Sequence, residues 1–162
     1  MASHPRVTNV IVAGLGGQGV VRATDILAEA AFLAGRDVKK SEIHGMSQRG
    51  GSVSSDVRFG EHILSPMVPA GEADFLVVLD AGQVQANRPQ LRPGGLLITP
   101  DWIEEKLLPH KRSLNVALLG ALSSHLDFPE ACWHAAIRAH LAEKLHPLNL
   151  EAFALGRDRS QP

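Results

Sequence analysis

Near its start the chain reads VTNVIVAGLGGQG, over residues 7–19. Residues 7–13 form a short, β-branched apolar run, which is typical of a buried strand, and Gly14 ends it. Apolar residues then recur at helical spacing over residues 17–34, and Gly35 stands where a helix commonly ends. The stretch therefore predicts a buried strand that leads into a helix through a glycine-rich turn.

The same alternation continues along the chain. Four further runs have the composition of strands: residues 36–41, 53–59, 73–80 and 96–99. Two runs are predicted to be helices and a third a short helix or turn: residues 115–125, 127–145 and 83–90. Asp127 is expected to cap the last helix, Pro147 to end it, and the polar residues from about 157 to form a flexible tail. The alternation predicts an α/β fold, a single three-layer Rossmann-like domain over residues 1–162 with a mostly parallel sheet.

Composition narrows the function classes. The 162 residues carry a net charge of -1 and only 4% aromatic side chains, which argues against a basic, base-stacking nucleic-acid interface. The apolar runs are far shorter than the ~20 residues of a membrane span. Cys132 is the single cysteine, so no internal disulfide is expected, which favours a cytoplasmic setting. The histidines lack metal-ligand spacing, and no metal site is predicted.

The glycine-rich turn satisfies the pattern G-x-G-x-x-G directly between a predicted strand and a predicted helix. In that context backbone N–H groups can hold a phosphate, and an acidic residue about 20 positions further on can hold a ribose hydroxyl. The candidate cofactor-binding residues are Gly14, Gly16, Gly17, Gln18, Gly19 and Glu42. The alternative is that the glycines only let the turn close tightly. Gln18 is unusual in a nucleotide site and also suits a contact between subunits.

A second polar segment, SEIHGMSQRGGSV over residues 41–53, separates two predicted strands. Glycines with polar side chains between them suit a binding loop or a subunit contact, and the alternative is a tight hairpin whose polar groups cap its own backbone. The candidate interface and substrate-access residues are His44, Gly45, Met46, Gln48, Arg49, Gly50 and Gly51. Of these, His44 can relay a proton or orient its own loop, and Arg49 can hold an anion or form an ion pair with Glu42 or a neighbouring subunit.

These motifs together resemble a known family. The chain is similar to the gamma subunit or domain of 2-oxoacid:ferredoxin oxidoreductases, and within it to the beta subunits of indolepyruvate ferredoxin oxidoreductase. The resemblance rests on Gly16-Gly17-Gln18-Gly19 and Glu42-Ile43-His44-Gly45-Met46-Ser47-Gln48-Arg49-Gly50-Gly51, and it continues along nearly the whole chain. It departs at Asp80-Ala81-Gly82-Gln83, where relatives carry a second glutamate and this chain has Gln83.

The resemblance implies oxidative decarboxylation of a 2-oxoacid, for this branch an arylpyruvate such as indolepyruvate. Coenzyme A would take the acyl group and ferredoxin the electrons. Thiamine diphosphate, Mg²⁺ and iron–sulfur clusters are then expected on a large partner subunit and no cofactor on this chain alone, in keeping with its single cysteine. The chain would be inactive by itself. Two alternatives stay open: a stand-alone nucleotide-binding regulatory module, and a structural scaffold with no residue near the chemistry.

Overall fold

The computed structural model describes residues 6–44 and 51–159. The strands are β1 (Val7–Leu15), β2 (Asp37–His44), β3 (Ser52–Gly60), β4 (Ala73–Val78) and β5 (Leu91–Ile98). The α-helices are α1 (Val20–Leu33), α2 (Val84–Asn87), α3 (Leu114–Ser123), α4 (Glu130–His140) and α5 (His146–Arg157). The first strand, the glycine turn and the first helix therefore form as the sequence predicts.

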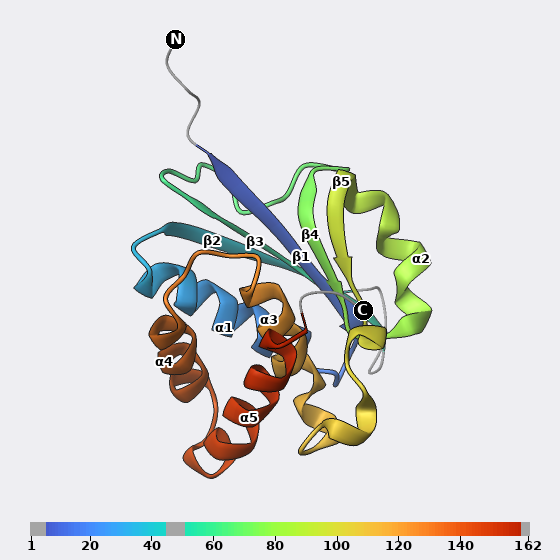
Figure 1. The fold of residues 1–162 in the computed structure, drawn as a ribbon. Coiled ribbons are helices and arrows are strands. Elements are labelled where there is room, and N and C mark those ends of the chain that lie inside the picture. Colours follow the sequence, from blue (N-terminus) through green and yellow to red (C-terminus); the bar gives the residue numbers. More distant parts are fainter. Residues whose placement is uncertain (1–5, 45–50, 160–162) are drawn as a thin grey trace.

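The five strands make one sheet in the order β2-β3-β1-β4-β5 (Figure 1). β1 pairs in parallel with β4, and β4 with β5, whereas β3 runs antiparallel to both β1 and β2. The predicted mostly parallel sheet is thus only partly right. The reason is the connection over residues 45–51, which is long enough for a hairpin between β2 and β3 but too short for the helical crossover that parallel strands need.

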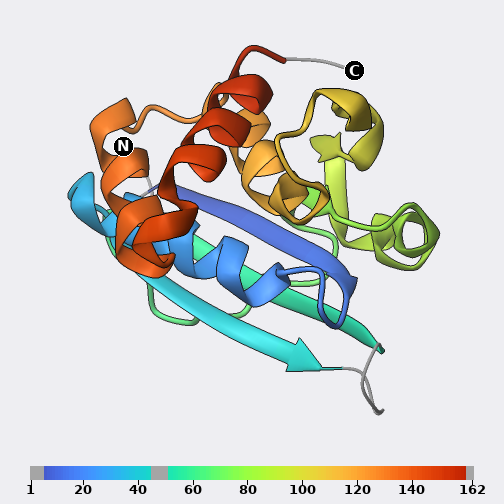
Figure 2. The same ribbon diagram turned by 90° about the horizontal axis from the view of Figure 1, so that it is seen from below.

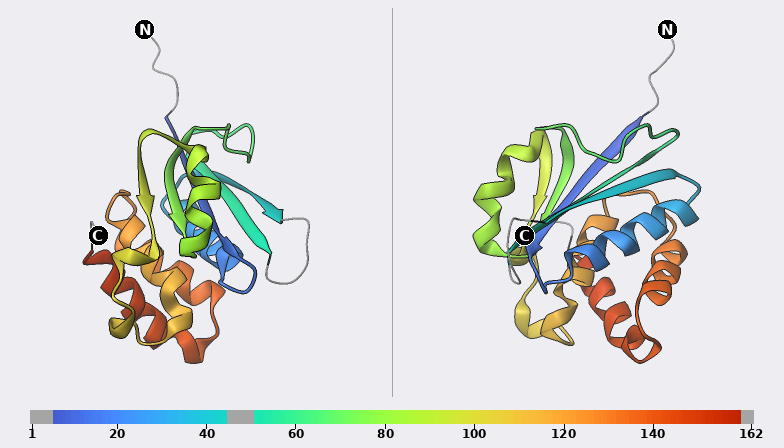
Figure 3. Two further views of the ribbon diagram at one scale, coloured as in Figure 1. Left: turned by 90° about the vertical axis from the view of Figure 1, so that its right-hand side faces the viewer. Right: turned by 180° about the vertical axis from the view of Figure 1, so that it is seen from behind.

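Two hydrophobic layers cover the sheet. On one face, β1 and β4 residues such as Val10 and Val77 join the larger core with side chains of α1, α3, α4 and α5. On the other face, Ile11 and Leu76 pack in a smaller core with Val84 of α2 and with Val68. Figures 1 and 3 show α2 beside β4 and β5, away from the other helices. Seen from below, α1, α4 and α5 lie in front of the sheet (Figure 2).

The predicted long helix over residues 127–145 is wrong. α4 ends at His140 because Leu141 adopts an extended conformation, and Pro147 lies in the first turn of α5 instead of ending a helix. Proline suits the first helical turn because its missing N–H would have no partner there. Asp127 is not the cap either, since Pro129 takes that position.

α5 packs closely on α3 at two glycines. A Cβ added at Gly156 would lie 1.7 Å from the Ala117 carbonyl oxygen, and one at Gly120 would lie 2.1 Å from the Phe153 carbonyl oxygen. Trp133 of α4 closes this part of the core, with its ring centroid 5.7 Å from that of Phe128 and 5.6 Å from that of Phe153. These contacts make the helical layer a single packed body that supports the inner face of the sheet.

Candidate functional site

The glycine turn lies at the carboxyl end of β1, and its glycines leave room for two side chains of the protein itself. Gly19 has a φ of 85°, in the left-handed region that favours glycine. A Cβ at Gly19 would lie 2.4 Å from Nδ2 of Asn115, and one at Gly14 would lie 2.8 Å from Oε1 of Gln18. The Asn115 amide also donates to the Gly19 carbonyl at 3.2 Å, which fixes the start of α1 against the start of α3.

Gln18 connects the glycine turn to the next parallel strand. Its Oε1 accepts a hydrogen bond from the Leu15 N–H at 2.7 Å, and its Nε2 donates to Oδ1 of Asp80 at 2.9 Å. The other carboxylate oxygen of Asp80 accepts from the Gly82 N–H at 3.0 Å and so begins the turn after β4. One side-chain amide therefore couples the ends of β1 and β4.

A third segment completes the arrangement. The Gly16 N–H donates to the Gly51 carbonyl at 2.8 Å, and the Ser52 hydroxyl donates to Oε1 of Gln83 at 2.8 Å. The Gln83 N–H in turn donates to the Asp80 carbonyl at 2.9 Å. Hydrogen bonds thus link the glycine turn, the start of β3 and the turn after β4 in a closed ring. We call this ring, made by residues 15–18, 51–52 and 80–83, the edge ring.

The edge ring places the end of the polar 41–53 segment, at Gly51 and Ser52, beside the glycine turn. Gly51 is the part of the predicted interface set that contributes to the ring. The backbone of His44 forms the last position of β2, opposite Val53. The remaining predicted interface residues lie outside the described part of the chain: Gly45, Met46, Gln48, Arg49 and Gly50.

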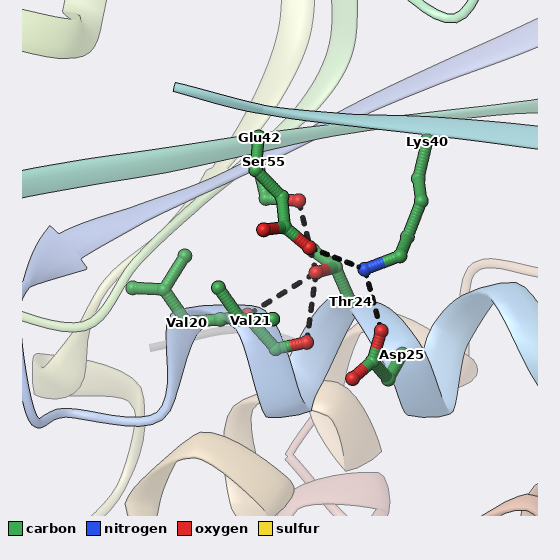
Figure 4. Close-up of polar contacts among 7 residues, drawn as sticks. All are labelled: Val20, Val21, Thr24, Asp25, Lys40, Glu42 and Ser55. Carbon is green, nitrogen blue, oxygen red and sulfur yellow. Dashed lines mark hydrogen bonds and ion pairs between the residues drawn. The ribbon is translucent and has the colours of Figure 1, made fainter. Parts of the chain in front are cut away.

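Glu42 lies apart from the glycine turn. It stands on β2, and β3 separates β2 from β1, so the two backbones are about 10 Å apart. Its Oε1 is 2.6 Å from the Lys40 amine, which is also 2.5 Å from Oδ1 of Asp25 on α1 (Figure 4). A ribose hydroxyl at Glu42 would compete with Lys40 for this carboxylate.

The Lys40 cluster has the electrostatics of a structural ion pair. Burial lowers the pKa of the Lys40 amine, but its hydrogen bonds to Asp25 and Glu42 outweigh burial, so the pKa lies above its ordinary value. Next to it, the buried Ser55 hydroxyl donates to the Thr24 hydroxyl at 2.9 Å (Figure 4). This polar cluster fixes α1 on β2 and β3.

Asp80 and Asn115 belong to the site but are not among the residues that the sequence predicts for it. The available signal for Asp80 is its position directly after a buried strand, since side chains at the carboxyl ends of neighbouring parallel strands meet at one edge. For Asn115 no local pattern exists, because it reaches Gly19 from a distant part of the chain.

Within residues 6–44 and 51–159, no group of three or more His, Cys, Asp or Glu side chains is placed to hold a metal ion. In the same ranges, no helix is both long enough and apolar enough to cross a bilayer.

Comparison with known proteins identifies relatives over almost the full length. Residues 9–109 match the family described as pyruvate ferredoxin/flavodoxin oxidoreductase. The indolepyruvate oxidoreductase subunit IorB of Pyrococcus horikoshii is 33% identical, over 91% of this chain and 93% of its own.

Solved structures share the fold. The gamma subunit of a keto/oxoacid ferredoxin oxidoreductase from Geobacter sulfurreducens superposes with a TM-score of 0.77 at 20% identity, over 95% of this chain and 96% of that one. A 2-oxoglutarate:ferredoxin oxidoreductase from Magnetococcus marinus gives a TM-score of 0.82 at 21% identity, over 97% of this chain and 31% of that longer chain.

Proposed function

Because the chain belongs to the pyruvate ferredoxin/flavodoxin oxidoreductase family, we propose that it is one subunit of a 2-oxoacid:ferredoxin oxidoreductase. The observation that carries this proposal is the match to a named subunit of such an enzyme over nearly the whole of both chains. The complex would oxidatively decarboxylate a 2-oxoacid, transfer the acyl group to coenzyme A and pass two electrons to ferredoxin. The name of the same relative supports indolepyruvate or a similar arylpyruvate as the substrate.

The redox groups belong, in this proposal, to a large partner subunit. A [4Fe–4S] cluster needs four cysteine thiolates, and this chain has one cysteine, Cys132. The residues present therefore do not fit an iron–sulfur cluster, and we assign the clusters, thiamine diphosphate and Mg²⁺ to the partner. The single cysteine needs no oxidising compartment, which supports a cytoplasmic location for the complex.

The edge ring is the part of this chain that we propose to face the partner. It joins three chain segments at the carboxyl ends of β1 and β4, the edge at which α/β sheets commonly present functional groups. β2 ends at the same edge, and the candidate residues His44 and Arg49 belong in the sequence to the segment from there to Gly51. Against the partner, this edge would help to shape the route by which the 2-oxoacid or coenzyme A reaches the catalytic centre.

The test is an anaerobic purification of the tagged chain from its native source, with the co-purifying chains identified by mass. We expect a larger subunit that contains iron and sulfide and whose 2-oxoacid oxidation depends on thiamine diphosphate. The isolated chain should show no such activity, and a panel of pyruvate, 2-oxoglutarate, phenylpyruvate and indolepyruvate would identify the substrate.

A chain that elutes alone at every salt concentration would refute the subunit proposal. Tight dinucleotide binding by that isolated chain would instead support a nucleotide-binding regulatory module. Calorimetry with NADH, NADPH and coenzyme A on the same preparation distinguishes the two results.

A further inference from the structure

A second candidate site lies at the opposite edge of the sheet from the edge ring. A pocket of about 630 Å³ opens where β1 and β4 begin and where β3 ends, and Val7, Gly60 and Phe75 are among its lining residues. This volume falls within the ~300–1,000 Å³ of small-molecule sites. The nine residues of β1 separate the pocket from the glycine turn by about 25 Å.

Charges of both signs line the pocket in equal number. Three are guanidinium groups and three are carboxylates: Arg6, Arg36, Arg92, Glu61, Asp74 and Asp127. A ligand with a single charge would meet groups of its own sign as well as groups of the opposite sign. A ligand that carries one positive and one negative group can match both sets.

Two of the arginines are already held in place. The Arg92 Nε lies 2.6 Å from Oδ1 of Asp74, whose Oδ2 accepts from the Asn9 N–H at 2.8 Å. Arg36 contacts both carboxylate oxygens of Asp127, at 2.9 and 3.0 Å. Arg36 also donates to the Ala34 carbonyl at 3.1 Å, and Arg92 donates to the Pro93 carbonyl at 3.1 Å. A guanidinium has five N–H donors, more than these contacts use, so both arginines can also bind a ligand carboxylate.

The carboxylates on the same walls suit an ammonium group. The side chain of Asp127 is 82% exposed, so solvent and a ligand can reach its oxygens while Arg36 fixes their position. Oxygen atoms of paired carboxylates keep lone pairs that accept N–H donors from an ammonium group.

Aromatic rings form the apolar part of the pocket. Phe75 and His125 line it together with Phe59, which is almost fully buried, and Val7 and Leu126 add aliphatic surface. The His125 ring stands 6.2 Å from the Phe75 ring and 6.3 Å from the buried ring of Trp102. An apolar or aromatic group of a ligand would find a matching surface there.

From this combination we propose that the pocket binds a free α-amino acid with an apolar or aromatic side chain. Its carboxylate contacts Arg92 and Arg36, its ammonium group contacts Asp127 or Asp74, and its side chain lies on the aromatic rings. The proposal rests on lining residues of this chain and not on the proposed oxidoreductase function.

The test uses the full chain and calorimetry with four probes. L-phenylalanine and L-leucine carry both charges, phenylpyruvate lacks the ammonium group, and phenethylamine lacks the carboxylate. We expect saturable binding of at least one amino acid, with the two singly charged probes weaker by about tenfold or more. Tryptophan fluorescence, to which Trp102 and Trp133 both contribute, should change on the same concentration scale when L-leucine or L-phenylalanine binds.

Variants then locate the site. Arg92→Gln and Asp127→Asn should each weaken amino-acid binding by about tenfold, whereas Arg138→Gln on the exposed side of α4 should leave it unchanged. The proposal is overturned if neither amino acid binds with a Kd below about 1 mM. Equal affinity for all four probes also overturns it, and that comparison needs no variant to fold.

Discussion

Gln18 offers the sharpest test of the edge ring. Replacing it with alanine removes the acceptor of the Leu15 N–H at 2.7 Å and the donor to Asp80 at 2.9 Å in one step. No other side chain among the described residues joins these two groups. The change therefore separates the glycine turn from the end of β4 while leaving the core of the sheet intact.

The expected loss in the free energy of unfolding follows from the two hydrogen bonds of the Gln18 side chain. The neutral bond to Leu15 contributes about 1 kcal/mol, and the bond to the Asp80 carboxylate about 1.5 kcal/mol, because hydrogen bonds to charged groups are stronger. Gln18 and Asp80 are half-buried, so water can satisfy part of what is lost. We expect the free energy of unfolding to fall by about 2 kcal/mol, or the Tm by roughly 4–8 °C for a chain of this size.

The assay is urea unfolding of Gln18→Ala beside wild type, with Gln85→Ala as the matched control on the exposed side of α2. The control should change the free energy of unfolding by less than about 0.5 kcal/mol. If Gln18→Ala is no less stable than Gln85→Ala, the edge ring does not hold the turn and the reasoning fails.

A second variant isolates the bond to Asp80. Gln18→Glu keeps the acceptor for Leu15 but sets a carboxylate against the Asp80 carboxylate. Two such groups at hydrogen-bond distance share a proton, so one pKa in the folded state rises above its unfolded value. The folded state then binds more protons, and the stability of this variant relative to wild type must fall as the pH rises from about 4. A pH-independent difference would show that the two side chains separate.

Three further predictions concern other parts of the chain. Burial raises the pKa of Asp56 in the folded state, although the hydrogen bond from the Val68 N–H opposes this rise. The folded state therefore binds more protons, and wild type should lose stability relative to Asp56→Asn as the pH rises above about 4. Urea unfolding of both proteins at several pH values will measure the difference. Gly156→Ala should lower stability by about 2 kcal/mol or more, because the new Cβ would lie 1.7 Å from the Ala117 carbonyl, and an unchanged melting temperature would contradict that packing. Arg49→Ala should reduce 2-oxoacid oxidation by the assembled complex with unchanged circular dichroism of the chain, whereas loss of the fold would indicate a structural role.

The sequence predicts the first strand, turn and helix because each has a local cause. The β-branched run and the positive φ of Gly35 at the end of α1 are properties of neighbouring residues. The direction of β3 is not local in this way. Alternation identifies a strand over residues 53–59 but does not say which neighbour it pairs with, and the sheet direction follows from the length of the 45–51 connection.

The ends of the helices α4 and α5 also cannot be predicted from neighbouring residues alone. Pro147 is compatible with the end of one helix and the start of another, and only packing chooses between them. Gly156 and Phe153 pack α5 against α3, and these contacts join residues that are far apart in the sequence. A periodic apolar pattern that ran through Leu141 and Leu145 therefore predicted one long helix where the chain forms two.

The glycine pattern predicts the geometry of the turn but not whether a ligand binds there. A phosphate oxygen and the Oε1 of Gln18 offer the same acceptor to the Leu15 N–H, and the strand–turn–helix geometry serves both equally. G-x-G-x-x-G between a strand and a helix thus predicts an acceptor beside the turn, but not whether a ligand or the chain supplies it. In the structure the Oε1 of Gln18 is that acceptor, and the Nε2 of the same amide donates to Asp80. A nucleotide that takes this acceptor position must displace Gln18, so Gln18→Ala should bind such a ligand more tightly if the position is a ligand site. If the edge ring serves assembly, the same variant should instead weaken the complex with the partner subunit.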